Sequence, residues 1–220
     1  MKTPQFLKSM ATSKATKLLM HKVASFPRGS TVYGTYEDGV SDVDVLVVVG
    51  NECKPLLQND INRIYQDVVD DTDCQFMCEE DFVAAIKDNK IDILECVFAN
   101  PQANNGKYTD MFVLDKWKLR QSVSSICSNS WVKCKKKLTV EKDYDLRCGQ
   151  KSLWHSLRIY MYGIQLAETG KIYDWAQANR LWYEIRDAET PTWEHYHQKY
   201  KKLYNELRSK LVSLCNKPIN

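Results

Sequence analysis

This sequence of 220 residues contains no apolar run long and uncharged enough to span a membrane, so we expect no membrane partner. Its N-terminus carries Lys2, Lys8, Lys14 and Lys17 without a compact apolar segment and a cleavage site, which predicts no signal peptide. Internal repeats and low-complexity segments are also missing from it. These absences favour an ordinary globular chain of one or two domains.

Cysteine pairs with metal-site spacing are missing as well. None of the eight cysteines forms a Cys-x-x-Cys pair, and Cys74 and Cys78 have no second ligand pair near them, so we expect no zinc site. In a chain without a secretory signal, reduced and mostly buried thiols are the default state. We therefore expect a reducing cytoplasm as the compartment.

A large excess of charge of one sign is the third absence. The 31 Lys and Arg residues nearly balance the 28 Asp and Glu residues, which gives a formal net charge of +3. The apolar fraction of 44% and the charged fraction of 27% are typical of globular proteins. A nucleic-acid contact would therefore have to be a local basic patch, because the whole molecule is only mildly basic.

A Val-rich run at Val43–Val49 predicts a buried strand, since it ends in unbroken apolar residues. Side chains alternate along a strand, so Asp42 and Asp44 point to the same face. Two neighbouring carboxylates repel each other unless a cation lies between them, and hard oxygen ligands suit Mg²⁺. A half-solvated edge strand without a metal is the alternative interpretation.

A glycine-rich turn precedes that strand. Gly29 and Ser30 begin the turn and Gly34 follows closely. Glycines let the backbone approach a bulky anion and leave N–H groups free to bind phosphate, although an ordinary turn has the same composition. A phosphate-binding turn beside a metal-binding strand is the arrangement that phosphoryl or nucleotidyl transfer needs.

The combined pattern resembles a known family. Arg28-Gly29-Ser30-x-x-Tyr33-Gly34, followed by Ser41-Asp42-Val43-Asp44, is similar to the DNA polymerase beta nucleotidyltransferase superfamily and in particular to its RNA-repair-associated branch of bacteria and phages. The similarity covers residues 26–95 well and residues 151–171 more loosely. It implies an α/β (α+β) fold in which a polymerase-beta-like domain with a small mixed sheet precedes a helical C-terminal domain.

A third carboxylate is needed to bring a second metal ion near the attacking oxygen. The superfamily takes it from the start of a neighbouring strand that runs into a helix. Asp73 fits that position, because we predict a strand over Asp73–Cys78 and a helix over Asp81–Lys87. Asp71 is the nearest competitor, and an acidic turn that only caps a loop is the remaining alternative.

The resemblance also implies the roles of these residues. Two Mg²⁺ ions, with Mn²⁺ as a substitute, would be bound by Asp42, Asp44 and Asp73. A carboxylate, which we take to be Asp73, would help to deprotonate an acceptor hydroxyl. The triphosphate of ATP or another nucleotide would be bound at Gly29, Ser30 and Tyr33.

Helical spacing predicts two further helices in the first half of the chain, over Lys8–Phe26 and over Leu57–Val69. Pro27 would end the first of them. Ile91–Ala99 fits either a further strand or a short helix. Glu95 within that run has the Leu-Glu context of the branch, so both metal binding and pairing with a buried cation are open to it.

The turn-forming stretch at residues 100–106 predicts a boundary between a catalytic domain (1–105) and a helical domain (106–220). In the second half we expect a helix from Asp145 to Glu168, stopped by Gly170. Leucines mark one side of that helix. The nearly opposite stripe carries no acid and consists of Lys151, His155, Arg158 and Tyr162.

This stripe could contact a triphosphate or the leaving pyrophosphate, because charge-assisted donors stabilise phosphate oxygens. The branch carries a similar Lys…His…Arg helix, which implies nucleotide binding by Lys151, His155 and Arg158. A solvated face or a partner-binding face is the alternative. A separate basic run could contact a nucleic-acid backbone, with Trp131 available for stacking, unless it is only a solvated helix face. Its members are Lys133, Lys135, Lys136 and Lys137.

We therefore expect an enzyme that moves a nucleoside monophosphate from a triphosphate to an acceptor hydroxyl. An RNA 3′ or damaged end is the first choice of acceptor, from the branch resemblance and the lysine run, and protein or small-molecule hydroxyls are alternatives. A sugar transferase would also use Asp-x-Asp, but it leaves the Gly-Ser turn unexplained. An inactive RNA-binding or regulatory protein would have no reason to keep three clustered carboxylates.

Overall fold

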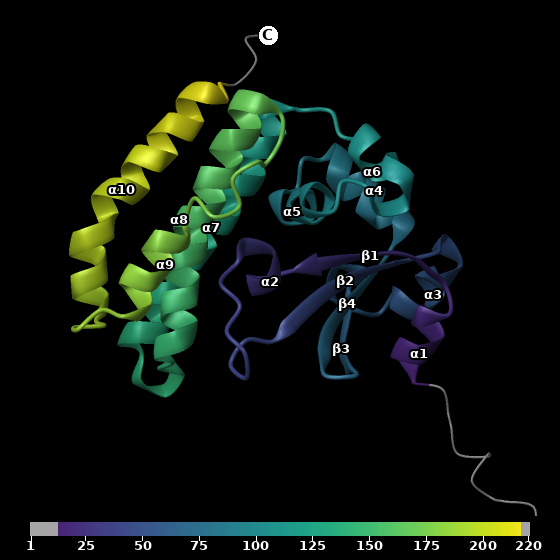
Figure 1. Cartoon of the computed structure of the whole chain (residues 1–220), viewed down its shortest axis with the longest axis horizontal. Helices are drawn as coiled ribbons and strands as arrows, with labels where there is room; N and C mark the ends of the chain where they lie inside the picture. Colours follow the sequence, from purple (N-terminus) through teal and green to yellow (C-terminus); the bar gives the residue numbers. More distant parts are fainter. Residues whose placement is uncertain (1–12, 217–220) are drawn as a thin grey trace, which may run out of the picture.

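The computed structural model describes residues 13–216. It is an α+β arrangement in which the first half of the chain forms a small mixed sheet with short helices, and the second half forms long helices (Figure 1). This confirms the predicted fold class at the level of a mixed sheet followed by a helical half.

The sheet has four strands in the order β1-β2-β4-β3. Strand β2 (Val43–Val49) lies in the middle, antiparallel to β1 (Lys22–Arg28) and parallel to β4 (Thr72–Cys78). Strand β3 (Tyr65–Val69) pairs with β4 as an antiparallel hairpin and forms the other edge. Strands β2 and β4 therefore confirm the two strands expected from the sequence.

The helix expected over Lys8–Phe26 is wrong for the part that the structure describes, and residues 8–12 lie outside it. Helix α1 covers only Lys14–Leu19, and the chain then enters β1. Ala24 and Phe26 are buried alternately against the sheet neighbours, which is the period of a strand. Pro27 lies inside β1 and ends no helix, because an edge strand tolerates a missing N–H group.

The helix expected over Leu57–Val69 is also wrong. Helix α3 (Lys54–Leu57) ends where the predicted helix would begin, and β3 occupies the second part of the range. Ile61, an apolar residue that a helix over this range was expected to bury, is 86% exposed. Asp70 and Asp71 both have positive φ angles, 47° and 60°, so they form a tight turn that pairs β3 with β4.

Short helices cover both faces of the sheet. One face packs against α4 (Glu79–Lys87), α5 (Ile91–Ala99) and α6 (Lys107–Asp110), and α1 and α3 lie on the other (Figure 1). The predicted helix ending at Lys87 is confirmed, and the run at Ile91–Ala99 is a helix. Single-turn or 3₁₀ segments complete this half: α2 (Ser30–Tyr33), η2 (Asn51–Cys53), η3 (Ile61–Arg63) and η4 (Ala103–Gly106).

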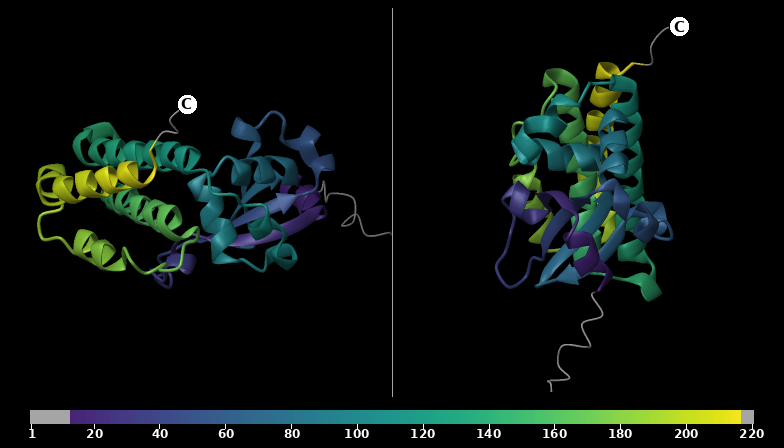
Figure 2. Two further views of the ribbon diagram at one scale, coloured as in Figure 1. Left: turned by 90° about the horizontal axis from the view of Figure 1, so that it is seen from above. Right: turned by 90° about the vertical axis from the view of Figure 1, so that its right-hand side faces the viewer.

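Long helices dominate the second half of the chain and lie beside one another (Figure 2). They are α7 (Lys116–Thr139), α8 (Leu146–Thr169) and α10 (Trp193–Leu214), with the shorter α9 (Asn179–Arg186) and the 3₁₀ segment η5 (Glu141–Asp143) between them. The Asp145 carboxylate accepts a hydrogen bond from the Cys148 N–H at the start of α8, and Gly170 ends the helix with a φ of 75°. The helix expected over this range is therefore confirmed.

One apolar core runs through both halves of the molecule. Its buried residues include Phe26 and Leu46 of the sheet and Leu157 and Leu211 of the long helices. Tyr108 of α6 packs on Phe26 with ring centroids 5.8 Å apart, so the segment after residue 105 belongs to the packing of the sheet half. The domain boundary expected at that residue stays a prediction.

Within residues 13–216, no helix has both the length and the apolar character needed to cross a membrane. The cysteines are free thiols, and all of them except Cys148 are buried.

Candidate functional site

The glycine-rich turn and the start of β2 form one wall of a cleft of about 700 Å³. Gly29 has a φ of 69°, and a Cβ at this position would lie 2.3 Å from Oδ2 of Asp44. The turn therefore packs directly on the carboxylate, and a side chain here would displace it. The N–H groups of Ser30 and Thr31 make no hydrogen bond within the described residues and remain available to a ligand.

Two of the three predicted aspartates, Asp42 and Asp44, line this cleft, and Asp73 lies beside Asp44 on the adjacent strand. Asp44 of β2 lies directly opposite Asp73 of β4 in the parallel register, and neighbouring strands are about 4.8 Å apart. Asp42 lies just before β2 and lines the cleft together with Asp44. Arg28 of β1 is the antiparallel neighbour of Asp44 on the other side. The structure thus brings the three carboxylates together beside one guanidinium.

Asp71, the competitor for the third position, lies elsewhere. It belongs to the exposed turn between β3 and β4, whereas Asp73 is within β4 and in register with Asp44. The strand pairing therefore favours Asp73 as the third carboxylate.

The surroundings of Asp44 change the ionisation of its carboxylate. Burial raises the pKa of Asp44 above its ordinary value, the nearby charges of Asp73 and Asp42 raise it further, and the Arg28 guanidinium opposes them. A cation between these groups would relieve both effects by supplying positive charge.

The carboxylate oxygens of Asp42, Asp44 and Asp73 do not all lie within 4.8 Å of one another. Within the described residues, the group of three whose potential ligand atoms all lie within 4.8 Å of one another is His21, Glu52 and Cys53, at the opposite end of β2. His21 and Glu52 are exposed, and burial raises the pKa of the Cys53 thiol, which makes it a poorer metal ligand. The aspartates instead extend from the start of β2, with Asp42 and Asp44, to the adjacent strand β4, with Asp73.

The helical half supplies the opposite wall of the cleft. Lys151 from α8 and Lys133 from α7 both line it with exposed side chains. The Lys151 charge acts on Asp44, opposing the rise in its pKa, so the two walls are electrostatically coupled. Lys151 thus faces the cleft, as the sequence stripe suggested.

Arg158 occupies a different environment from Lys151, although both belong to the same stripe. It is only 2% exposed, and its Nη2 lies 3.3 Å from Oε1 of Glu95 on α5. Its guanidinium carbon lies 3.4 Å from the centroid of the Tyr33 ring. Arg158 borders the cleft, but its charge is directed at Glu95 and Tyr33. Of the two roles open to Glu95, the structure therefore shows pairing with a buried cation.

The remaining members of the stripe also face the interior. Tyr162 is fully buried, and its hydroxyl donates to the Trp175 carbonyl. His155 lines the cleft, and its Nδ1 is 2.9 Å from Nη2 of Arg158. Burial and the neighbouring positive charge of Arg158 lower the pKa of His155 to about 3, so this ring is neutral at physiological pH.

The basic run on α7 does not form one surface. Lys133 lines the cleft, whereas Lys136 and Lys137 pair with Asp143 at 3.2 and 2.8 Å, and Lys135 is exposed outside the lining. Trp131 is buried, with its ring centroid 4.4 Å from that of Tyr204, so the stacking role expected for it is wrong.

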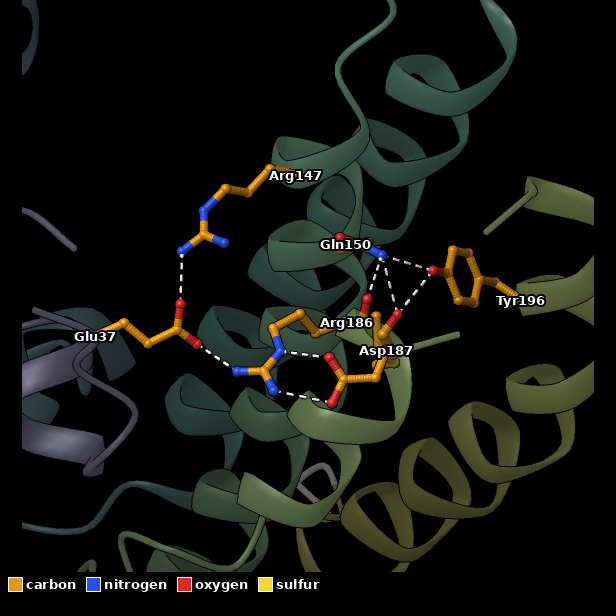
Figure 3. Close-up of polar contacts among 7 residues, drawn as sticks. Glu37, Arg147, Gln150, Arg186, Asp187 and Tyr196 are labelled. Carbon is orange, nitrogen blue, oxygen red and sulfur yellow. Dashed lines mark hydrogen bonds and ion pairs between the residues drawn. The ribbon is translucent and has the colours of Figure 1, made fainter. Parts of the chain in front are cut away.

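Sequence reasoning missed a contact between the two walls, shown in Figure 3. Glu37, in the loop before β2, pairs with Arg186 of α9 and lies 3.5 Å from Arg147 of α8. Arg186 also donates two hydrogen bonds to Asp187, at 2.7 and 2.9 Å. Arg147 lines the cleft one helical turn before Lys151, and this spacing was the signal that could have identified it.

A second cavity, of about 470 Å³, lies on the other side of the aspartates. Asp44 borders both cavities, Asp42 borders the first and Asp73 the second. The carboxylates therefore lie where the two cavities meet. Besides Val45 and Val68, the second one is lined by Arg28, Asp44, Gln66, Asp67, Asp73 and Gln75.

Neither a protein-family model nor a curated protein sequence matches this chain.

Proposed function

We propose that this protein is a metal-dependent nucleotidyltransferase whose sheet half is a polymerase-beta-like catalytic unit. The observation that carries the proposal is the pairing of Asp44 with Asp73 across two parallel strands, with Gly29 packed on the Asp44 carboxylate. This places a turn with free N–H groups against a row of acids at the edge of a cleft of nucleotide size.

The donor set fits Mg²⁺. Asp42, Asp44 and Asp73 offer only carboxylate oxygens, which are the ligands that hard divalent cations prefer. The raised pKa of Asp44 reflects burial and negative neighbours that a cation would offset. When bound, two Mg²⁺ ions supply charge stabilisation at the transferred phosphate and activation of the acceptor oxygen.

The first cavity suits the triphosphate. The free N–H groups of Ser30 and Thr31 can donate to phosphate oxygens at one wall. Lys133, Lys151 and Arg147 bring positive charge from the other wall, where it would stabilise the leaving pyrophosphate. Arg158 acts beneath this site, where it pairs with Glu95 and supports Tyr33 of the turn.

The reaction exchanges one phosphorus–oxygen bond for another. The acceptor hydroxyl oxygen attacks the α-phosphorus, and the bond from that phosphorus to the oxygen bridging to the β-phosphate breaks, with its electron pair leaving on pyrophosphate. The Asp73 carboxylate, which faces the second cavity, accepts the hydroxyl proton and passes it to water.

The resemblance by itself implies an RNA end as the acceptor, whereas the cytoplasm as the compartment is expected from the reduced thiols. The lysine run gives RNA little support, because only Lys133 lines the cleft while Lys136 and Lys137 are paired with Asp143. The class of acceptor therefore depends on the cavity beside Asp73.

The test is incubation of the purified protein with Mg²⁺ and each α-labelled nucleoside triphosphate, with pyrophosphate release and label on host RNA, protein and metabolites as readouts. Asp44→Asn should lower Mg²⁺-dependent pyrophosphate release by roughly a thousandfold without unfolding the protein. Asp71→Asn is the matched control and should stay near the wild-type rate. Equal rates for Asp44→Asn and the wild type would overturn the proposal.

A further inference from the structure

Three potential metal ligands meet at the end of β2 that lies away from the aspartates. A ring nitrogen of His21, a carboxylate oxygen of Glu52 and Sγ of Cys53 all lie within 4.8 Å of one another. His21 lies in the turn between α1 and β1, and the other two residues belong to η2. Two separate segments of the chain thus bring a nitrogen, an oxygen and a sulfur donor to one place.

Main-chain hydrogen bonds hold these two segments together. The Gly50 N–H donates to the His21 carbonyl at 2.9 Å, and the Cys53 N–H donates to the Gly50 carbonyl at 3.0 Å. Next to them, Lys22 of β1 pairs with Val49 of β2. The spacing of the three ligands is therefore set largely by the backbone, which reduces the entropy that an ion would have to overcome on binding.

Gly50 leaves room for the Glu52 carboxylate. A Cβ at Gly50 would overlap both carboxylate oxygens of Glu52, so this side chain folds back over residue 50. There its Oε1 lies 2.9 Å from Nδ1 of His21. The absence of a side chain at Gly50 thus lets the carboxylate turn towards His21 and Cys53.

The donor set suits zinc. Imidazole nitrogen, carboxylate oxygen and thiolate sulfur are the ligand types that Zn²⁺ binds, at about 2.0–2.3 Å and in tetrahedral geometry. Ligand atoms that already lie within 4.8 Å of one another need side-chain movements on the order of 1 Å to close around the ion. The side chains of His21 and Glu52 are 47% and 60% exposed, which leaves a fourth coordination position to water.

The thiol ligand lies just below this exposed pair. Cys53 is 1% exposed, and burial together with the Glu52 charge raises the pKa of its thiol. A thiol that coordinates zinc loses its proton, which passes to water as the zinc–sulfur bond forms. Zinc therefore competes with that proton, and a hard cation such as Mg²⁺ gains little from sulfur.

We propose that His21, Glu52 and Cys53 form a zinc-binding site, with water as the fourth ligand, distinct from the aspartates of the cleft. The ion would join the segment between α1 and β1 to the segment that follows β2. This inference does not depend on the proposed nucleotidyl transfer. The spacing rules for zinc motifs do not detect such a site, because its ligands come from positions 31 residues apart in the chain.

The experiment titrates the reduced, metal-free protein with Co²⁺ and then with Zn²⁺ in the presence of excess Mg²⁺. A thiolate-to-cobalt charge-transfer band reports only a site that contains sulfur, so the aspartates cannot produce it. We expect one equivalent of Co²⁺ to produce the band and one equivalent of Zn²⁺ to abolish it. Zinc should also raise the unfolding temperature, because it binds the folded chain.

Variants of each ligand assign the site. Cys53→Ser should abolish the band, and His21→Gln and Glu52→Gln should each weaken zinc binding about tenfold or more. Glutamine at position 21 can still donate to Glu52, so this variant should fold, and thermal unfolding without metal checks all three. Cys148→Ser, at the one cysteine that is not buried, and His197→Gln, at an exposed histidine of α10, are the controls and should keep the wild-type affinity.

Several results would overturn the inference. Less than half an equivalent of bound zinc, or a cobalt spectrum without the thiolate band, would mean that His21 and Glu52 are only a surface ion pair above a core cysteine. Unchanged zinc affinity in both His21→Gln and Glu52→Gln would also contradict the site. These two changes affect exposed side chains, so they decide the question even if Cys53→Ser does not fold.

Discussion

The two walls of the first cavity are built in different ways. On the sheet wall the backbone fixes the functional groups, because Asp44 and Asp73 are neighbours in strand register and Gly29 packs on Asp44. On the helical wall long side chains from α7 and α8 reach in, and Lys151 is exposed while Arg158, two turns further along, is buried under α5. The regular spacing of paired strands therefore places functional side chains together directly. On a helix, whether a residue of the stripe reaches the cleft depends on which elements pack over its turn.

The largest effect should come from breaking the buried part of the helical wall. Arg158→Ala removes the partner of Glu95 and leaves a buried carboxylate unpaired, which should lower the free energy of unfolding by about 3–5 kcal/mol in denaturant titrations. The double variant Glu95→Gln with Arg158→Met, which removes both charges, should recover much of that loss. A change below about 1 kcal/mol for Arg158→Ala would mean that the pair does not support the wall.

The close approach of turn and strand on the sheet wall can be tested at Gly29. Gly29→Ala should cost about 2–4 kcal/mol of stability and most of the activity, because alanine suffers both a positive φ and a 2.3 Å contact with Asp44. Gly39→Ala is the matched control, since Gly39 has the same φ of 69° and nothing within 4 Å of the added Cβ. Equal losses in the two variants would show that the contact with Asp44 is unimportant.

The exposed part of the helical wall should affect binding and leave stability nearly unchanged. Lys151→Ala should raise the KM for the nucleoside triphosphate by about tenfold, because one phosphate contact is lost, while the free energy of unfolding changes by less than about 0.5 kcal/mol. Steady-state kinetics and thermal unfolding measure the two quantities. Lys135→Ala, exposed on α7 outside the cleft, should change neither, and a similar KM in both variants would contradict the assignment.

The smallest effect concerns pH. The pKa of His155 is lowered to about 3 in the folded protein, so the unfolded chain, with a pKa of about 6.5, takes up the proton first. The contribution of His155 to stability is therefore complete above about pH 6.5 and is lost as the pH falls towards 3. Because the ring is partly accessible, we expect a difference on the order of 1 kcal/mol between pH 7 and pH 5. His155→Gln should flatten this part of the stability–pH curve, and parallel curves would contradict it.

The same contrast explains what the sequence could predict. The run at Val43–Val49 and the strand after Asp73 are recognisable because their apolar residues are buried on both faces of the sheet. Strands β1 and β3 were mistaken for helices, since both lie at sheet edges and their spacing fits either period until the partner strand is known. The local pattern of apolar residues does not identify the partner strand.

The candidate site could likewise be predicted only in part. Gly29 and the aspartates belong to a compact motif, so their proximity was accessible from spacing. Arg147 and the Glu37 contacts were missed because they join segments far apart in the chain. The burial of Trp131 could not be read from a lysine-rich run, because it depends on α10 lying across α7.

The apolar core that joins the two halves also restricts how the molecule can move. Closing the first cavity as a hinge between rigid bodies would slide packed side chains such as Phe26 and Leu157 out of a single continuous cluster. Motion at the first cavity is therefore expected mainly in the elements outside that core. These include the cleft lysines and the loop before β2, whose Glu37 pairs with Arg147 and Arg186 outside the apolar core.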